Sequence, residues 1–370
     1  MSHDGALTDA QLLQRTAREV FTELFPSTRV RELMATQSGF DRQDWRRLTC
    51  ELGVTGLMVG EQFGGSGMSA RELGVVFEEA GRSIGGAPLF AVAALAIPLL
   101  LEVDNADACA RWLPGLCDGS LLATVIYADA DGRWGPAQVD IHADGDRLFG
   151  RGGYVIDAAE SDLIFTPART PEGPVVFAVE RHGAGVEVTR LITLDQTRKQ
   201  AHVEFSGAPG VRLCGADHPL DRAYATSCAL LACESAGVAA RCLDMTAEYA
   251  RERVQFGRTI GSFQAIKQKL ADLLIQVESA RSAATAAVEA VATDSPDLWW
   301  TASLAKAYCS EAAMHASEET IQIHGGIGFT WEHDAHLYFK RARTGQELLG
   351  AARKHYDLVA EHLSRIGAKR

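Results

Sequence analysis

The sequence has few of the features that mark secreted, metal-binding or membrane-spanning proteins. Its eight cysteines are scattered without a C-x-x-C pair, which favours buried, reduced thiols over a zinc site or a disulfide framework. The apolar run 90–101 contains a proline and is too short to span a bilayer. Residues 1–7 are polar and do not resemble a signal peptide. We therefore expect a cytoplasmic protein with no membrane contact.

The sequence also lacks an excess of positive charge. Its formal net charge of −12 argues against a nucleic acid or an anionic membrane as a partner. A cofactor that carries phosphate is still compatible with this charge, because it needs only local cations and N–H donors. With 370 residues, 47% of them hydrophobic, the chain is long enough for two or three globular domains.

The first part of the chain, residues 1–118, is predicted to be a helical domain. Apolar residues recur at helical spacing, and Thr8 is placed to cap the first helix. Glycine and proline separate the later helices. The predicted helices are 8–25, 40–52, 69–81 and 91–101.

The middle part, residues 119–216, is predicted to be a β domain. Seven short runs rich in β-branched and aromatic residues lie between 121 and 205 and are separated by glycine-containing turns. This spacing is typical of an antiparallel barrel or sandwich.

The last part, residues 217–370, is predicted to be a four-helix bundle that carries oligomerisation. Its apolar pattern returns to helical spacing, and the segments are long with short connections. The predicted helices are 224–253, 261–292, 298–324 and 346–363.

Two segments of the last part have the composition of a phosphate-binding site. Residues 321–329, IQIHGGIGF, place glycines at the end of a predicted helix, where main-chain N–H groups can face a phosphate. Residues 253–264, RVQFGRTIGSFQ, supply a guanidinium with five donors at Arg253, an aromatic wall at Phe256 and an amide at Gln264. For Phe256 and Phe263 alone, core packing is the competing interpretation.

These two segments, in this domain order, resemble the acyl-CoA dehydrogenase family of flavoproteins across nearly the whole chain. The segment from Trp45 to Ser69 (WRRLTCELGVTGLMVGEQFGGSGMS) and residues 144–163 (DGDRLFGRGGYVIDAAESDL) are also similar to family motifs. The resemblance implies a mainly α fold with a central β domain between two helical domains. It also implies removal of a proton from Cα and a hydride from Cβ of an acyl-CoA thioester, giving the trans-2-enoyl-CoA.

The resemblance implies FAD as the cofactor and an electron-transfer flavoprotein as the electron acceptor. In the family the second motif meets the FAD, and the Gln-x-x-Gly-Gly turn meets the adenosine diphosphate end from a neighbouring subunit. The residues to which the resemblance assigns cofactor binding are Arg253, Gln255, Phe256, Phe263, Gln264, Gln322, Gly325, Gly326 and Tyr154. Tyr154 takes the place of an aromatic residue behind the flavin.

The sequence departs from the family where the α-proton must be accepted. Most members have a glutamate 23 residues after the second glycine of the Gly-Gly pair, a position that is Leu349 here. A smaller group has it one helix earlier, a position that is Ser227 here. Neither side chain can act as a base at neutral pH. The family's hydroxyl near flavin N5 is replaced by Ile156, which has no donor.

These departures leave three interpretations. The chain is a subunit of a heteromeric enzyme, similar to the actinobacterial dehydrogenases that act on bulky CoA thioesters such as steroid side chains, and its partner brings the glutamate. Alternatively it is a self-sufficient homo-oligomeric dimer or tetramer with a displaced base, for which Glu347 and Glu234 are the candidates. The third interpretation is a flavin-free acyl-CoA-binding or scaffold protein. The first is preferred, and no metal site is predicted.

Overall fold

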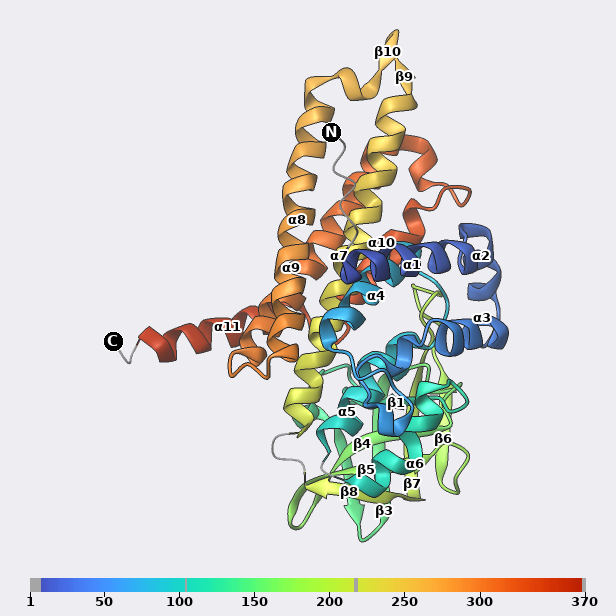
Figure 1. Ribbon diagram of the computed structural model, residues 1–370, viewed down its shortest axis with the longest axis vertical. Helices are drawn as coiled ribbons and strands as arrows, with labels where there is room; N and C mark the ends of the chain where they lie inside the picture. Colours follow the sequence, from blue (N-terminus) through green and yellow to red (C-terminus); the bar gives the residue numbers. More distant parts are fainter. Residues whose placement is uncertain (1–7, 104, 216–218, 368–370) are drawn as a thin grey trace.

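The computed structural model describes residues 8–103, 105–215 and 219–367. Helices, then strands, then helices follow one another along the chain (Figure 1). The N-terminal helices are α1 (Asp9–Leu24), α2 (Ser27–Ala35), α3 (Arg42–Arg46), α4 (Ala70–Ser83), α5 (Ile97–Glu102) and α6 (Ala106–Cys117). Shorter turns of helix lie between them: η1 (Arg47–Glu51), η2 (Val54–Gly56), η3 (Glu61–Phe63) and η4 (Phe90–Ala96).

Local capping explains where two of these helices begin. The Thr8 hydroxyl accepts the Gln11 N–H at 3.3 Å, and the Gln11 side chain accepts the Thr8 N–H at 2.9 Å, so both donors at the start of α1 are satisfied. Ser69 and Glu72 form the same reciprocal pair at the start of α4. The predicted cap at Thr8 is therefore confirmed.

The strands form one eight-stranded sheet. They are β1 (Ala123–Val125), β2 (Asp140–Asp144), β3 (Arg147–Ile156), β4 (Leu163–Thr170), β5 (Gly173–Glu180), β6 (Val186–Arg190), β7 (Gln200–Pro209) and β8 (Val211–Gly215). Their order is β6-β7-β3-β2-β4-β5-β8, and β1 pairs in parallel with β4. A short helical turn, η5 (Pro136–Gln138), precedes β2. Alternate residues of these strands, such as Ile141, Leu148 and Val203, are buried in a core of their own.

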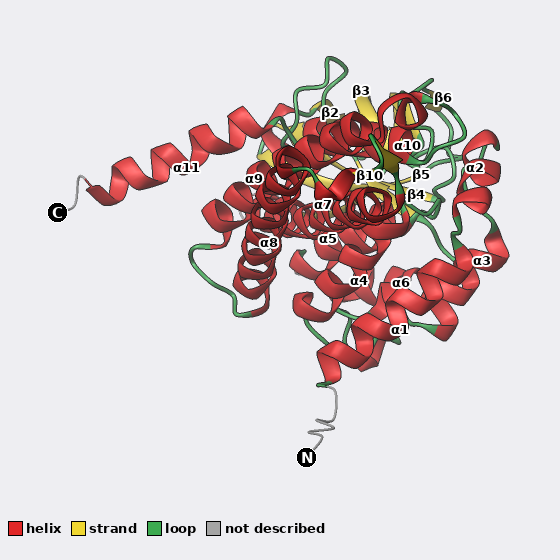
Figure 2. Cartoon of the chain, turned by 90° about the horizontal axis from the view of Figure 1, so that it is seen from above, coloured by secondary structure: helices red, strands yellow, loops and turns green. Residues whose placement is uncertain are grey.

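The C-terminal helices are α7 (Pro219–Glu252), α8 (Gln264–Ala292), α9 (Leu298–His324), α10 (Ala335–Glu347) and α11 (Ala352–Gly367). A hairpin of β9 (Val254–Gln255) and β10 (Arg258–Thr259) joins α7 to α8 through η6 (Ile260–Ser262), and η7 (Gly325–Phe329) follows α9. The bundle runs along the long axis of the molecule, with the hairpin at the end away from the sheet (Figure 1). α11 extends sideways from the body in both views (Figures 1 and 2).

Helix α7 is the centre of the bundle. Its segment Leu220–Glu252 is long and apolar enough to cross a membrane, yet its most apolar stretch is entirely buried inside the protein. It packs against α4, α8 and α9. It is therefore a core helix, and its apolar character comes from being covered on all sides.

The mainly α fold class with a central β domain and a C-terminal bundle is confirmed, but one predicted helix is wrong. The predicted helix 346–363 is broken: α10 ends at Glu347, and α11 begins at Ala352. Leu349 and Gly350 between them have φ of 58° and 99°, outside the helical region. The apolar pair Leu348-Leu349 made this turn look like helix in the sequence.

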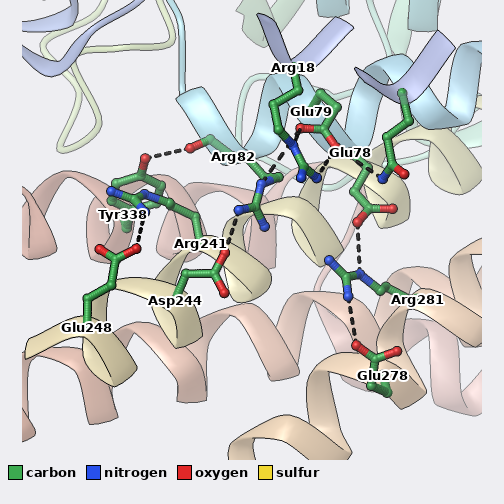
Figure 3. A network of polar contacts seen from close by, with 11 residues as sticks. Arg18, Glu78, Glu79, Arg82, Arg241, Asp244, Glu248, Glu278, Arg281 and Tyr338 are labelled. Carbon is green, nitrogen blue, oxygen red and sulfur yellow. Dashed lines mark hydrogen bonds and ion pairs between the residues drawn. The ribbon is translucent and has the colours of Figure 1, made fainter. Parts of the chain in front are cut away.

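Arginine–carboxylate pairs join the N-terminal helices to the bundle (Figure 3). Glu79 on α4 is buried and accepts Nε and Nη2 of Arg18 from α1 at 2.9 and 2.7 Å. Arg82 on α4 donates to Asp244 of α7 at 2.5 Å. The main-chain oxygen of Arg82 accepts the Tyr338 hydroxyl of α10 at 2.6 Å. The start of α10 is therefore tied to α4.

Two glycines allow α4 and α7 to touch backbone to backbone. A Cβ added at Gly81 would lie 2.0 Å from the Glu234 oxygen, and one at Gly237 would lie 1.9 Å from the Glu78 oxygen. Neither neighbour is a flexible side chain, so the two helices would have to move apart.

We predict that Gly237→Ala lowers the free energy of unfolding by roughly 2–4 kcal/mol, although alanine normally stabilises a helix over glycine by about 1 kcal/mol. Urea unfolding monitored by circular dichroism measures the change. The control is Gly345→Ala in α10, where the nearest atom to the added Cβ is Ser235 Oγ at 3.7 Å. A stability of Gly237→Ala equal to or above that of Gly345→Ala would contradict the close crossing.

Candidate functional site

The structure brings the two glycine- and arginine-containing segments to the same end of the bundle. The rings of Tyr249 on α7 and His324 on α9 stack at 4.3 Å, and the Tyr249 hydroxyl lies 3.4 Å from the His324 carbonyl oxygen. Arg253 directly follows the last residue of α7, and its N–H donates to the Tyr249 oxygen at 2.8 Å. Gly325 directly follows His324, the last residue of α9. The helix ends that carry Arg253 and the Gly-Gly turn are therefore packed against each other.

The β9–β10 hairpin presents the aromatic part of the segment 253–264. Phe256 and Gly257 form its two-residue loop with φ of 53° and 77°, as a type I′ hairpin turn requires. Phenylalanine rarely adopts this conformation, and the Phe256 side chain is 92% exposed. Behind it, Phe263 packs edge-on against Phe256 at 6.2 Å, and the Arg258 guanidinium lies 4.0 Å from the Phe263 ring centre. The strained, exposed aromatic points to a ligand-contacting role.

The Gly-Gly turn has the open backbone that a phosphate group needs. Gly325 has φ of 63° and ψ of −138°, a combination that favours glycine strongly. A Cβ added at Gly325 or Gly326 would meet no atom within 4 Å, so the space in front of the turn is free. Arg253, Gln255, Gln264 and Gln322 are all exposed near this end of the bundle. This donor set and free space fit the diphosphate end of a dinucleotide.

Tyr154 lies away from the Gly-Gly turn, in the wall of a cavity of about 590 Å³ between the sheet and α10. The β3–β7 ladder shifts register between Gly152 and Val155, and Tyr154 in this bulge has φ of 53° and points into the cavity. Trp134 and the loop 191–194 line the same cavity. The aromatic walls are compatible with a planar ring system. By contrast, Ile156 is buried in the core and has no donor to offer.

A separate cavity of about 460 Å³ lies next to the segment that follows the Gly-Gly turn. Leu194 lines both cavities, and Ile321, Gly328 and Trp331 line the second. The loop that carries Leu194 therefore borders both cavities.

Glu234, one candidate base, lies in a buried ion cluster. Its carboxylate accepts Arg198 Nη2 at 2.5 Å and Arg341 Nη1 at 2.8 Å. Arg341 also donates to Asp195 Oδ2 at 2.9 Å and to Thr197 Oγ1 at 2.6 Å. Burial would raise the pKa of Glu234, but the charges and hydrogen bonds of the two arginines lower it on balance. A carboxylate held in this way is a poor proton acceptor, so this geometry gives Glu234 a structural role.

Glu347, the other candidate, lies at the rim of the cavity that contains Tyr154. Its side chain is 55% exposed and pairs with Arg343 one helical turn earlier at 2.9 Å. It is therefore within the cavity wall but well solvated, with no dry environment to make it a stronger base.

The two positions at which the family places its glutamate are sealed. Leu349 and Ser227 have no exposed surface, and neither lines any of the cavities described above. The Ser227 hydroxyl lies 2.6 Å from the Ala94 oxygen, and the Leu349 oxygen accepts Nε2 of His355 at 2.8 Å. The Tyr224 hydroxyl donates to the same Leu349 oxygen. The Ser227 hydroxyl and the Leu349 carbonyl are therefore already hydrogen-bonded within the fold.

A buried lysine completes this sealed turn. Lys306 on α9 is inaccessible to solvent, and its Nζ donates to the main-chain oxygens of Gln346, at 2.9 Å, and Gly350. Burial lowers the pKa of Lys306 to about 8. The turn between α10 and α11 is therefore held by a charged group that is costly to bury.

Comparison with known proteins identifies the family. Residues 8–120 match the acyl-CoA dehydrogenase N-terminal domain and residues 225–364 match the acyl-CoA dehydrogenase C-terminal domain. The chain belongs to the acyl-CoA dehydrogenase family. Members of this family are oxidoreductases that act on acyl-CoA, and the present chain is one of these enzymes by family.

Similar proteins include acyl-CoA dehydrogenases of Mycolicibacterium smegmatis and Mycobacterium tuberculosis. The chain is 35% identical to acyl-CoA dehydrogenase IpdE2 of Mycolicibacterium smegmatis over 94% of this chain and 96% of the relative. It is 31% identical to acyl-CoA dehydrogenase FadE27 of Mycobacterium tuberculosis over 91% and 92%. Among solved structures it is similar to a chain of the ChsE4-ChsE5 complex of Mycobacterium tuberculosis, with a TM-score of 0.89, 30% identity and 97% and 98% coverage. It is also similar to a chain of a steroid acyl-CoA dehydrogenase variant, Tcur3481-Tcur3483. The TM-score is 0.88 and the identity 28%, over 97% of this chain and 99% of that chain.

Sequence reasoning missed several residues of the candidate site. Arg258 lies inside the segment 253–264 that resembles the family, whereas Trp134 and Arg343 reach the site through contacts between distant segments. Arg258 has a local signal, because it is a cation next to the Phe-Gly loop. Trp134 and Arg343 face the same cavity from the sheet and α10, which no local pattern indicates.

We predict that Lys306→Met changes how stability depends on pH. The pKa of Lys306 is about 8 in the folded chain against 10.5 for a free lysine, so the unfolded chain binds more protons between these values. The stability of the natural chain relative to Lys306→Met should therefore rise from pH 8 to 10, by up to about 1.4 kcal/mol per pH unit.

Urea unfolding of both proteins at pH 7, 8, 9 and 10 measures this difference. The control is Lys267→Met, an exposed lysine on α8, whose stability difference should stay flat with pH. A difference for Lys306→Met that does not change above pH 8 would contradict the lowered pKa of Lys306 in the folded chain.

Proposed function

We propose that the chain is the subunit of a heteromeric, FAD-dependent acyl-CoA dehydrogenase that lacks the catalytic glutamate and completes the cofactor site of its partner. The observation that carries this proposal is that Leu349 and Ser227 are sealed, whereas the Gly-Gly turn is open. By a half-site we mean a subunit that supplies only part of an active site. Such a subunit is expected to lack the catalytic base and to keep the residues that bind the phosphate end of the cofactor. The partner then supplies the carboxylate that accepts the α-proton.

The residues of this chain bind and orient in this proposal. Arg253, Gln322 and the N–H groups of Gly325 and Gly326 hold the diphosphate end, and Gln255, Phe256, Phe263 and Gln264 contact the cofactor along the hairpin. Tyr154 offers an aromatic wall in the cavity beside α10. When bound, FAD accepts the hydride that leaves Cβ of the acyl-CoA.

The relatives support the choice of a heteromer and of a bulky substrate. The names ChsE4-ChsE5 and Tcur3481-Tcur3483 each describe a two-component assembly, and the second is called a steroid acyl-CoA dehydrogenase. We propose a related acyl-CoA thioester for this protein, in the cytoplasm, with an electron-transfer flavoprotein as acceptor. The assembly is a dimer or tetramer of two kinds of subunit.

The alternative, a self-sufficient enzyme, is favoured by one observation. Glu347 lines the same cavity as Tyr154, so it is the described carboxylate of α10 that a flavin-bound substrate could reach. The flavin-free scaffold remains the third possibility, and bound flavin distinguishes it from both others.

The test is the visible spectrum and activity of the chain, purified alone and after co-expression with a dehydrogenase-like protein encoded nearby. We expect a colourless, inactive chain that gives a yellow, active complex with its partner, whose flavin band near roughly 450 nm is bleached by acyl-CoA. Flavin bound and reduced by acyl-CoA in the chain alone would overturn the half-site. A complex that stays colourless and inactive would overturn both enzyme interpretations.

We predict that Glu347→Gln leaves kcat of the assembled complex within about twofold, because the partner carries the base. If Glu347 were itself the base, its loss would lower kcat by roughly 10²–10⁴-fold. Steady-state kinetics of the complex, measured with the acyl-CoA that reduces it fastest, decides between these outcomes. The matched control is Glu361→Gln, an exposed glutamate of α11 away from the cavity, which should have no effect.

A further inference from the structure

Arg31 lies on α2, in the N-terminal helices, yet its guanidinium contacts the turn that follows the Gly-Gly segment. Nη1 donates to the Trp331 oxygen at 2.7 Å, and Nη2 donates to the His333 oxygen at 3.1 Å and to Asp334 Oδ1 at 2.8 Å. Nη1 also lies 3.5 Å from His336 Nε2. One side chain therefore holds two main-chain carbonyls and a carboxylate of a turn that is 300 residues away along the chain.

The contact replaces a local helix cap. Asp334 is the N-cap residue of α10, a position at which aspartate normally accepts an N–H of the first turn and stabilises the helix by about 1 kcal/mol. Here its side chain makes no such bond, because Asp334 Oδ1 is engaged by Arg31 and by the Ser27 hydroxyl. The first N–H of α10, that of Ala335, is instead accepted by His333 Nδ1 at 3.1 Å, while the Asp334 side chain connects the helix to α2.

Apolar packing does little to hold this turn. The side chains of Phe329 and Trp331 are 86% and 67% exposed, so burial contributes little to ordering the residues between the Gly-Gly turn and α10. Lys340 lies 4.2 Å from the Trp331 ring centre, an exposed contact of modest strength. The fork of Arg31 is the polar contact that fixes the main chain here, because it satisfies two carbonyls at once.

The position of the turn matters for the Gly-Gly segment before it. Gly325–Phe329 forms η7, and Trp331 comes two residues later, so a shift of the turn moves the N–H groups of Gly325 and Gly326. A diphosphate is held only where those groups point at it together. We propose that Arg31 is a positioning residue: it fixes the Gly-Gly turn for the diphosphate end of the cofactor. This proposal rests on the FAD-dependent function proposed above.

The test compares Arg31→Met with Arg29→Met in the same helix. Arg29 is also ion-paired, to Asp44 at 3.0 Å and to Glu32 at 3.3 Å, but its partners lie within the N-terminal helices. The two side chains have similar exposure, 25% for Arg31 and 34% for Arg29. Each substitution removes one partly exposed arginine from α2, and only the first releases the turn.

The first measurement needs no cofactor. Hydrogen exchange of the isolated chain, followed by mass spectrometry, should show peptides covering 325–337 exchanging at least about tenfold faster in Arg31→Met and unchanged in Arg29→Met. Equal exchange in the two variants would overturn the positioning role. Thermal melting of the two variants should agree, which excludes a general loss of stability as the cause.

The second measurement is the FAD dissociation constant of the complex with its partner, reconstituted from flavin-free protein. We expect an increase of about tenfold or more for Arg31→Met and no more than about twofold for Arg29→Met. If the natural complex binds flavin and Arg31→Met binds it equally well, only the role of Arg31 is overturned. If the natural complex takes up no flavin, the proposed function fails and the role of Arg31 fails with it.

Discussion

The arrangement of the molecule depends on one buried ion cluster. Arg341 of α10 and Arg198 of the loop before β7 share the Glu234 carboxylate of α7, and Arg341 also holds Asp195 of the same loop. Arg198 lies over the Phe90 ring of the N-terminal helices at 4.6 Å. Two carboxylates and two guanidiniums balance each other, which a buried cluster requires, because one unpaired charge would cost roughly 3–5 kcal/mol. The cluster therefore fixes the sheet, the bundle and the N-terminal helices in one relative position.

The candidate cofactor cavity depends on this arrangement. Arg341 points into the cluster on one side of α10, while Thr344 and Glu347 of the same helix line the cavity that contains Tyr154. The cluster also holds the loop whose residues 191–194 close the cavity from the sheet side. A displaced α10 would change both walls together. This is why a glutamate deep in the chain, Glu234, matters for a site that it does not touch.

The sequence was sufficient for the elements that depend on periodicity and for the family. The predicted bounds 298–324 coincide with those of α9. It failed at 346–363, where Leu349 adopts a positive φ that apolar patterning conceals. Glu234 was a candidate base in the sequence, where its partners are not visible. Periodicity cannot show that Arg198 and Arg341 lie against Glu234 from positions 36 and 107 residues away. Contacts between distant segments set the chemistry of each charged residue, and local pattern does not contain them.

The turn between α10 and α11 keeps a polar framework around Leu349. Lys306, Tyr224 and His355 all donate to main-chain oxygens of residues 346–350, and Leu349 is strained and fully buried among them. Such a polar framework is more than a leucine needs for packing. In the proposed half-site, the cofactor's phosphate end and the proton acceptor are served by different chains. One chain can then lose its glutamate without cost, as long as the turn that supports α10 keeps the other end of the site in place.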